Sequence, residues 1–289
     1  MNIIVGATGR VGSHLINDIK QYSVPIRAVV RNPKKLGDKS IEFRKADLFD
    51  FEQLLHAFEG GTTVFVITPE SMSSHDIIGD TERIVDNYRK AIEQTGIKNI
   101  VGLSCVGAHI DGDNGNIRMS RILEQGFEGL QARKVFIRPS YYFSNWVGYL
   151  DTINQHGLLP TFFPEDLNIE MNSPVDVARF IAKVMVEEDV FENKKKIFEL
   201  SGPRLYSPRD VVSIYSEVLN KPINLQVIPS EKWQETLLSV GFSENTAANL
   251  ADMTRSVVEN TARAEWPDDL IKLPTTLENY LIRETAKNI

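Results

Sequence analysis

The strongest constraint on the fold is a glycine-rich turn near the start of the chain. Gly6, Gly9 and Gly12 have the spacing GxxGxxG, directly after an apolar run and directly before an amphipathic segment. In such a βα turn the glycines permit a tight bend, a close approach to a pyrophosphate, and close packing of helix on strand. We expect a dinucleotide-binding turn rather than a merely glycine-rich one. The residues expected to hold the pyrophosphate at the helix N-terminus are Gly6, Thr8, Gly9, Arg10, Val11 and Gly12.

Short apolar runs alternate with amphipathic segments of helical length through the first half of the chain. The runs expected to form buried strands are 2–5, 26–30, 63–67, 99–103 and 134–137, with a shorter strand at 42–45. The expected helices are 11–21, 51–57, 77–94 and 118–130. Repeated strand–helix–strand units predict an α/β fold, a Rossmann-type doubly wound parallel sheet.

Beyond residue 150 the pattern becomes mainly helical. The expected helices there are 175–187, 208–219 and about 230–264, the expected strands are 197–200 and 225–228, and the segment 275–285 closes the chain. We expect a dinucleotide-binding domain over 1–150 and a smaller C-terminal substrate lobe over 151–289, interleaved into one compact unit. The active cleft would lie between the lobe and the carboxyl ends of the strands.

An arginine after the second expected strand predicts which dinucleotide binds. That strand, 26–30, is followed by Arg31, with Lys34 and Lys35 close behind. Sites for NADH usually have an acidic residue here for the ribose 2′-hydroxyl, whereas a guanidinium suits a 2′-phosphate. We therefore expect NADPH, with a solvated basic turn as the alternative.

Further cofactor contacts are expected after the third and fourth strands. Asp47 and Leu48 follow the third strand, and Asp47 either accepts from the adenine amino group or caps the helix near Phe51. Thr68 and Pro69 end the fourth strand, where the backbone would pass beneath the ribose and phosphates.

Aromatic side chains cluster after the sixth strand, where the substrate cleft should open. Five of the nine residues from 141 to 149 are aromatic: Tyr141, Tyr142, Phe143, Trp146 and Tyr149. Aromatic faces suit flat conjugated rings, so we expect Tyr142, Phe143, Trp146 and Tyr149 to line the substrate pocket. The alternative is that several of them belong to the core of the lobe.

Charge and composition exclude several other functions. A formal net charge of −7 argues against nucleic-acid binding, which needs a basic face. The single cysteine, Cys105, fits a reducing cytoplasm, and apolar runs are far shorter than the roughly 18 residues of a membrane span. We expect a cytoplasmic protein with no metal site and with a small-molecule substrate. Residues 111–116 are expected to form a mobile loop over the cofactor rather than a calcium site.

Taken together, several motifs resemble the NmrA-like branch of the atypical short-chain dehydrogenases/reductases. The matching segments are 5–12, 30–33, 46–48, 103–108, 137–139, 174–178 and 200–203, with Phe143, Asn145 and Ser207. The resemblance extends over nearly the whole chain. It implies NADPH-dependent reduction of quinones or azo dyes, or a redox-sensing regulatory role. The related sugar-nucleotide epimerases share the first half of the pattern.

One departure from the wider family selects among these functions. The Tyr-x-x-x-Lys pair expected after the fifth strand is absent, because residues 105–133 contain neither tyrosine nor lysine, although Glu124 is present as in some relatives. Reducing a ketone or epimerising a sugar needs a positioned acid or base, whereas hydride transfer to a quinone yields an anion that can take its proton from water. We expect an NADPH-dependent quinone reductase. The alternatives are a non-catalytic NADP(H) sensor and, third, an epimerase.

The same resemblance implies which residues lie at the nicotinamide. They are Ser104, Cys105, Pro139, Ser140 and Tyr141, of which Ser104 and Tyr141 are the catalytic candidates. The acceptor would be an aromatic or quinone-like molecule. A homodimer or a regulatory protein partner is left open.

Overall fold

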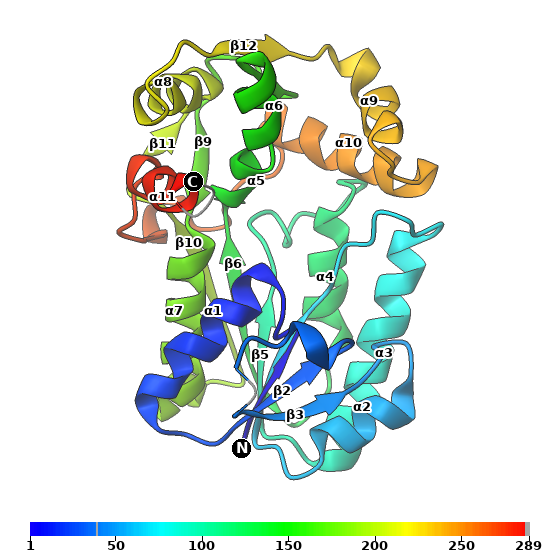
Figure 1. Cartoon of the computed structure of the whole chain (residues 1–289). Helices are drawn as coiled ribbons and strands as arrows, with labels where there is room; N and C mark the ends of the chain where they lie inside the picture. The colour runs from blue at the N-terminus through cyan, green and yellow to red at the C-terminus, as the bar shows by residue number, and fades with distance from the viewer. Residues whose placement is uncertain (39, 287–289) are drawn as a thin grey trace.

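The computed structural model describes residues 1–38 and 40–286, which form one large sheet flanked by helices and a smaller lobe at one edge of that sheet (Figure 1). Eight strands lie in the order β13-β10-β6-β5-β4-β1-β2-β3, and every neighbouring pair is parallel. They are β1 (Asn2–Val5), β2 (Ile26–Val30), β3 (Glu42–Lys45), β4 (Thr63–Ile67), β5 (Asn99–Leu103), β6 (Arg133–Pro139), β10 (Lys195–Ser201) and β13 (Ile271–Lys272). The carboxyl ends therefore share one edge, and this edge faces the lobe.

Helices cover both faces of the sheet because strand residues alternate between two cores. Ile4 packs with the helices α1 (Arg10–Ile19) and α7 (Pro174–Val186). Its neighbours Ile3 and Val5 face the opposite core, and the helices there are α2 (Phe51–Phe58), α3 (Ile77–Thr95) and α4 (Ile117–Gly126). This period-two burial is what a doubly wound sheet requires, and the expected fold class is confirmed.

The lobe has its own core and two small sheets. Its helices are α5 (Ser144–Val147), α6 (Leu150–His156), α8 (Pro208–Val218), α9 (Trp233–Ser239), α10 (Glu244–Val258) and α11 (Leu277–Thr285). Its strands are β7 (Tyr141–Tyr142), β8 (Leu158–Thr161), β9 (Ile169–Asn172), β11 (Leu205–Tyr206) and β12 (Asn224–Val227). Aromatic side chains such as Phe143, Trp146 and Tyr215 fill the space between them.

The chain passes between the sheet and the lobe several times. After β6 it enters the lobe, returns through α7 and β10, enters the lobe again, and adds β13 to the sheet before α11. Residues beyond 150 thus contribute to both layers. Among the described residues, no helix is both long and apolar enough to cross a bilayer.

Two expected helices are shorter than the sequence pattern indicated. The helix expected at 230–264 is interrupted: α9 ends at Ser239, Gly241 adopts a positive φ of 96°, and Ser243 caps α10 by accepting from the Thr246 N–H. The helix expected at 118–130 ends at Gly126. In the first case a glycine in the left-handed region ends the helical segment without steric cost, which the apolar spacing alone did not reveal. In the second case the C-cap is Phe127, whose φ is −98°.

Candidate functional site

The glycine-rich turn between β1 and α1 has three glycines with different steric surroundings. Gly6 has a φ of +69°, and a Cβ there would lie 2.3 Å from Cδ1 of Ile67. A Cβ on Gly12 would lie 2.2 Å from the carbonyl oxygen of Gly6, so the helix can approach the turn only if this residue is glycine. Gly9 is less crowded by protein, with its nearest such contact at 3.2 Å, which leaves its outer side open to a ligand.

The start of α1 presents backbone N–H groups to this turn. The N–H of Gly9 donates to the Gly6 carbonyl at 2.9 Å, and the N–H of Ser13 donates to the Gly9 carbonyl at 2.9 Å. Arg10, Val11 and Gly12 lie in the first helical turn, whose N–H groups have no intrahelical acceptor. Together with the helix dipole they form a site suited to a diphosphate.

Arg10 connects this turn to the lobe. Its guanidinium donates to the Ser144 hydroxyl at 3.0 Å and is 3.5 Å from Oδ1 of Asn145. Beside it lies an open cavity of about 410 Å³, whose walls include Thr8, Gly9 and Tyr280. The turn therefore lies at the junction of the sheet and the lobe.

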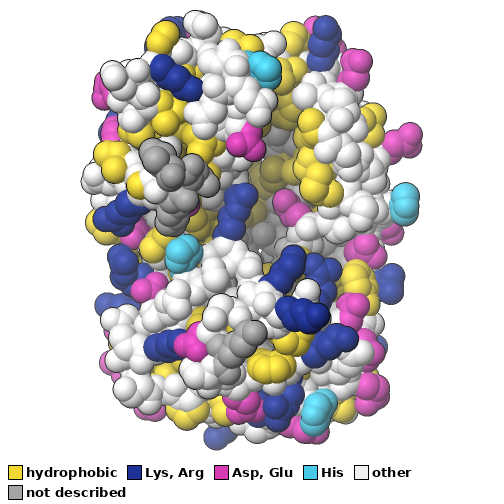
Figure 2. Space-filling model, viewed as in Figure 1, with side chains coloured by type: hydrophobic (Ala, Val, Ile, Leu, Met, Phe, Trp, Pro, Cys, Tyr) yellow, Lys and Arg dark blue, Asp and Glu magenta, His cyan; other side chains and the backbone are white. Residues whose placement is uncertain are grey.

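A group of basic side chains lies at the carboxyl ends of β2 and β3. Arg31 is exposed and has no hydrogen bond or ion pair with any described residue. Lys45 is paired in register with Val30, so it lies at the same edge as Arg31. In the view of Figure 2, Lys and Arg side chains gather below a hollow between the sheet and the lobe. A free guanidinium here is what binding of a 2′-phosphate requires.

Asp47 does not cap α2. The N-cap is Asp50, whose side chain accepts from the Gln53 N–H at 3.1 Å, because α2 begins at Phe51. Asp47 instead accepts from the Phe49 N–H at 3.1 Å, in a turn directly after β3. The helix-cap alternative is thus wrong, and binding of adenine by Asp47 and its half-buried neighbour Leu48 stays a prediction.

The residues expected near the ribose and nicotinamide follow three neighbouring strands. β4 pairs with β5, and β5 pairs with β6, all parallel. The segments that follow them at the shared edge contain Thr68 and Pro69, then Ser104 and Cys105, then Ser140 and Tyr141, with Pro139 as the last residue of β6. The fold therefore brings these residues to one edge, and their contacts with a cofactor stay predictions.

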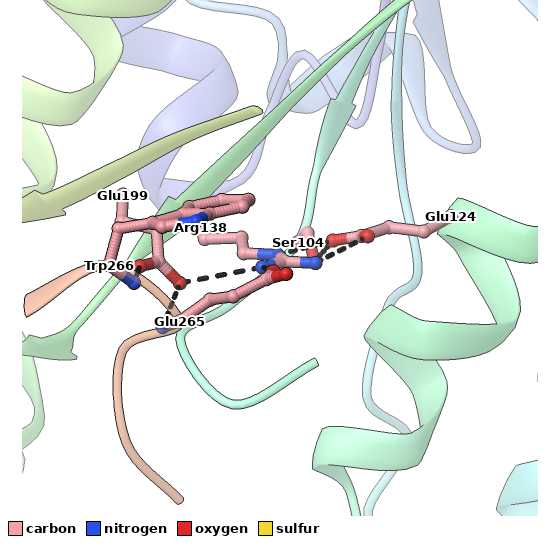
Figure 3. A network of polar contacts seen from close by, with 6 residues as sticks. All are labelled: Ser104, Glu124, Arg138, Glu199, Glu265 and Trp266. Carbon is pink, nitrogen blue, oxygen red and sulfur yellow. Dashed lines mark hydrogen bonds and ion pairs between the residues drawn. The ribbon is translucent and has the colours of Figure 1, made fainter. Parts of the chain in front are cut away.

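Ser104 belongs to a buried polar network (Figure 3). Its hydroxyl donates to Oε1 of Glu124 at 2.6 Å, and the same carboxylate accepts two bonds from Arg138, each 2.8 Å long. Arg138 also contacts Glu265 at 2.6 Å and Glu199 at 3.4 Å. Because the Ser104 proton is directed to Glu124, the hydroxyl offers the cleft only its lone pairs.

The same network fixes the segment between α10 and β13. The Glu199 carboxylate accepts the backbone N–H groups of Glu265 and Trp266, at 3.1 and 3.0 Å. Arg138 is 2 % exposed, and burial lowers its pKa, but the hydrogen bonds and charges of Glu124 and Glu265 outweigh this effect and raise the pKa above its ordinary value. The arginine stays charged and holds three carboxylates together. The sequence pattern did not predict this network; its signal in the sequence is that Arg138 follows the apolar run 135–137 and that Glu199 lies between Phe198 and Leu200.

The aromatic side chains of the cluster at 141–149 differ in how deeply they are buried. Phe143 is 0 % and Trp146 1 % exposed, and the Trp146 indole donates to the sulfur of Met171 at 3.2 Å, so both lie in the lobe core. Tyr141, Tyr142 and Tyr149 are only partly buried and keep some exposed surface. Burial raises the pKa of Tyr141 far above its ordinary value, so this phenol is a poor acid here.

The segment 111–116 is attached to the lobe rather than free over the cleft. Asn114 and Asn116 are buried, and a Cβ on Gly115 would lie 1.9 Å from the Asn249 carbonyl of α10. Arg121 donates to the Gly112 carbonyl at 2.9 Å. Within residues 1–38 and 40–286, no group of three or more His, Cys, Asp and Glu side chains is arranged to hold a metal.

Comparison with known proteins gives a consistent picture. The family model described as "NmrA-like family" matches residues 2–281. The NAD(P)H azoreductase of Xenophilus azovorans is 24% identical over 254 residues, covering 86% of this chain and 84% of that protein. Quinone oxidoreductase 2 of Escherichia coli (strain K12) is 26% identical over 259 residues, covering 87% of this chain and 86% of that protein.

One solved structure similar to this fold is the NADPH-dependent quinone oxidoreductase of Escherichia coli complexed with NADPH. It superposes with a TM-score of 0.82 at 24% identity, covering 99% of this chain and 100% of that chain. The two proteins share the sheet-and-lobe architecture.

Proposed function

The chain belongs to the NmrA-like family, and from this premise we propose that it is an NADPH-dependent oxidoreductase that transfers hydride to a quinone or a similar conjugated acceptor. Relatives along most of the chain are named as an NAD(P)H azoreductase and a quinone oxidoreductase. Both names describe reduction of flat conjugated molecules. The aromatic residues that remain partly exposed, Tyr141, Tyr142 and Tyr149, suit such acceptors.

The observation that carries the proposal is the glycine-rich turn beside an unpaired arginine. A Cβ on Gly12 would lie only 2.2 Å from the carbonyl oxygen of Gly6, so α1 can begin this close to the turn only with glycine there. The first N–H groups of α1 have no acceptors within the helix. Arg31 has no protein partner among the described residues. A diphosphate fits the turn, and a 2′-phosphate fits the guanidinium.

In this proposal the residues of the turn, from Gly6 to Gly12, bind the pyrophosphate, and Arg31 selects NADPH over NADH. Asp47 and Leu48 lie beside the adenine, Thr68 and Pro69 lie under the ribose, and Ser104, Cys105, Pro139, Ser140 and Tyr141 surround the nicotinamide. When bound, NADPH supplies a hydride from C4 of its nicotinamide ring. The protein holds donor and acceptor in one orientation and excludes water between them.

The test is NADPH oxidation in steady state with a panel of quinones and azo dyes. We expect turnover with at least one conjugated acceptor and a lower KM for NADPH than for NADH. NADPH oxidation that never exceeds background with any acceptor would overturn the reductase proposal.

A second candidate is a non-catalytic sensor that binds NADP(H) and reports redox state to a protein partner. The observation in its favour is that the Ser104 proton is bonded to Glu124 while residues 105–133 contain no tyrosine or lysine. Tight NADPH binding without turnover, together with co-purification of one partner protein, would favour this candidate.

A further inference from the structure

The cleft contains a carboxyl group that the reductase proposal does not yet use. Glu70 follows the end of β4 by three residues, beyond Thr68 and Pro69. Its Oε1 accepts a hydrogen bond from Nδ2 of Asn116 at 3.0 Å. Asn116 is 4 % exposed and is held by its own N–H, which donates to the Asn249 carbonyl at 3.3 Å. The side chain of Glu70 is therefore attached to a fixed partner.

Two buried polar atoms, one on the partner of Glu70 and one in the segment after β6, have no hydrogen-bond partner among the residues that the structure describes. They are Oδ1 of Asn116 and the hydroxyl of Tyr142. A buried polar atom without a hydrogen bond costs roughly 1–3 kcal/mol, so such atoms point to a ligand that completes them. The sequence places Asn116 at the start of α4 and Tyr142 just after β6.

Cys105 connects these groups in space. Burial raises the pKa of its thiol to about 11, the hydrogen bond with Ser120 opposes this effect, and the charges of Glu124 and Glu70 add to the increase. Burial also raises the pKa of Tyr142, and the nearby Cys105 contributes. Glu70, Cys105 and Tyr142 each follow the end of one of the adjacent parallel strands β4, β5 and β6, so the fold brings their segments to one edge of the sheet.

We propose that Glu70 is the proton donor of the acceptor site, held by Asn116 at the edge where the segments of Cys105 and Tyr142 follow the two neighbouring strands. This inference rests on the proposed reductase function. It supplies the acid that the missing tyrosine–lysine pair leaves unassigned. Neither Ser104, whose proton is bonded to Glu124, nor Tyr141 meets that need.

The surroundings of Glu70 suit the role. Protein around the carboxyl group raises its pKa, and the bond from Asn116 opposes this effect without cancelling it. The residue nevertheless keeps an exposed surface, through which water can return a proton. A proton donor benefits from both properties, because a raised pKa lets it keep its proton to higher pH and contact with water lets it regain the proton after each turnover.

The step balances in atoms and electrons. The hydride adds to the conjugated acceptor with its electron pair, the nicotinamide is oxidised, and the acceptor is reduced. Charge that collects on the acceptor's nitrogen or oxygen is neutralised as a new N–H or O–H bond forms and the Glu70 O–H bond breaks. The Glu70 carboxylate then takes a proton from water.

The requirement for Glu70 should follow the basicity of the anion that hydride transfer creates. An azo group yields a strongly basic nitrogen anion, a quinone yields a weakly basic oxygen anion, and a triarylmethyl cation yields a neutral product that needs no proton. General acids typically contribute 10²- to 10⁴-fold to rate. We expect Glu70→Gln to lower kcat about 100-fold with an azo dye, less with a quinone, and within about twofold of wild type with a triarylmethyl cation.

The matched control is Glu93→Gln, which removes the same charge from an exposed position in the last turns of α3. It should match wild type with all three acceptors. NADPH affinity, measured by fluorescence titration, should be unchanged in both variants. An equal loss with all three acceptors would mean a structural role for Glu70, and no loss with the azo dye would mean no role; either result overturns the inference.

The pH profile gives a second readout. Activity with the azo dye should fall as pH rises through the pKa of Glu70. This falling limb of the pH profile should be absent in Glu70→Gln. Asn116→Ala removes the bond that favours the carboxylate, so the limb should shift to higher pH. The ionisable groups around the cluster are Cys105, Glu124 and Arg138.

The start of α10 packs over residues 71–77 and contacts them through the uncharged Ser243, Asn245 and Thr246. A limb that persists unchanged in Glu70→Gln would assign it to another group and overturn the inference. If the wild type oxidises no NADPH with any acceptor, the proposed function itself fails. If the wild type is active and Glu70→Gln lowers kcat equally with all three acceptors, only the role of Glu70 as proton donor fails, and the proposed reductase function stands.

Discussion

Arg31 and Arg138 carry the same guanidinium in opposite surroundings. Arg138 is 2 % exposed and contacts three carboxylates, so its charge is neutralised inside the protein. Arg31 is exposed and has no partner among the described residues. A buried, fully paired arginine stabilises structure, whereas an exposed unpaired one beside a phosphate-binding turn is available to a ligand.

Replacing Arg31 with alanine should reduce the affinity for NADPH and leave the affinity for NADH unchanged. Hydrogen bonds to charged groups contribute roughly 1.5–3 kcal/mol, so we expect the Kd for NADPH to rise by about 10- to 100-fold. Titration calorimetry with both dinucleotides measures the change. Lys34→Ala is the control, because Lys34 is also exposed and basic but lies three residues further from β2, in the short helical turn Pro33–Lys35. Equal dissociation constants for the two dinucleotides in the wild type would refute the assignment.

Features of the site that depend on residues close together in the sequence could be predicted from the sequence. The spacing of Gly6 and Gly12 predicted a tight bend and a close helix approach, and both appear in the geometry of the turn. The Arg138 network was not predictable, because Glu124, Glu199 and Glu265 lie 14, 61 and 127 residues from Arg138. Glu70 was missed for the same reason: its partner Asn116 is 46 residues away.

At the level of the element, α1 depends on Gly12 for its position. Gly12→Ala would put a Cβ 2.2 Å from the Gly6 carbonyl and 3.0 Å from the Ala7 Cα, both backbone atoms that cannot rotate away. The helix must therefore move out of the turn. We expect the Kd for NADPH to rise at least 10-fold and unfolding to become easier by about 1–3 kcal/mol, the usual range for overpacking. Fluorescence titration and urea denaturation measure the two effects.

Gly37→Ala is the matched control for this variant. A Cβ on Gly37 meets no atom within 4 Å, and its φ is not positive, so the substitution should leave both quantities near wild type. Unchanged NADPH binding in Gly12→Ala would show that the approach of α1 to the turn is not required for the site.

The elements themselves were predictable in proportion to their length. The runs at 2–5, 26–30, 63–67 and 99–103 coincide with β1, β2, β4 and β5, because strands buried on both faces are almost wholly apolar. The two-residue strands β7, β11 and β13 carry no such pattern. Their pairing depends on residues elsewhere in the chain, such as Met171 opposite Tyr141.

Across the whole molecule, the Arg138 network connects segments from four parts of the chain. It joins α4, β6, β10 and the segment that leads from α10 into β13. Arg138→Met keeps much of the side-chain volume but leaves Glu124 and Glu199, which are 4 % exposed each, without their counter-ion. Breaking a buried pair in this way typically costs about 3–5 kcal/mol, which urea denaturation should reveal.

Arg209→Ala is the comparison for that experiment. Arg209 also contacts two carboxylates, Glu165 and Asp166, but all three side chains are largely exposed to water. Solvent screens such pairs, so this variant should unfold close to the wild-type midpoint. If Arg138→Met loses no more unfolding free energy than Arg209→Ala, the Arg138 network does not contribute to holding the sheet and the lobe together.

The repeated crossings of the chain between sheet and lobe also determine how the whole molecule should unfold. α7, β10 and β13 lie in the sheet layer, while the segments between them lie in the lobe, and Arg10 bonds Ser144 across the cleft at 3.0 Å. Neither layer can lose its structure without disturbing the other. We therefore expect a single calorimetric transition, and we expect NADPH to move that whole transition upward.

At an NADPH concentration 100 times the Kd, binding to the folded state alone adds about 2.7 kcal/mol of stability, enough to raise the Tm by several degrees. Scanning calorimetry of the wild type with and without NADPH measures the shift, and Gly12→Ala, whose Kd is expected to be at least 10-fold higher, should show at most about half of it at the same NADPH concentration. Two transitions, of which NADPH moves only one, would mean that the sheet and the lobe unfold separately, so that the crossings of the chain do not couple the cofactor site to the lobe.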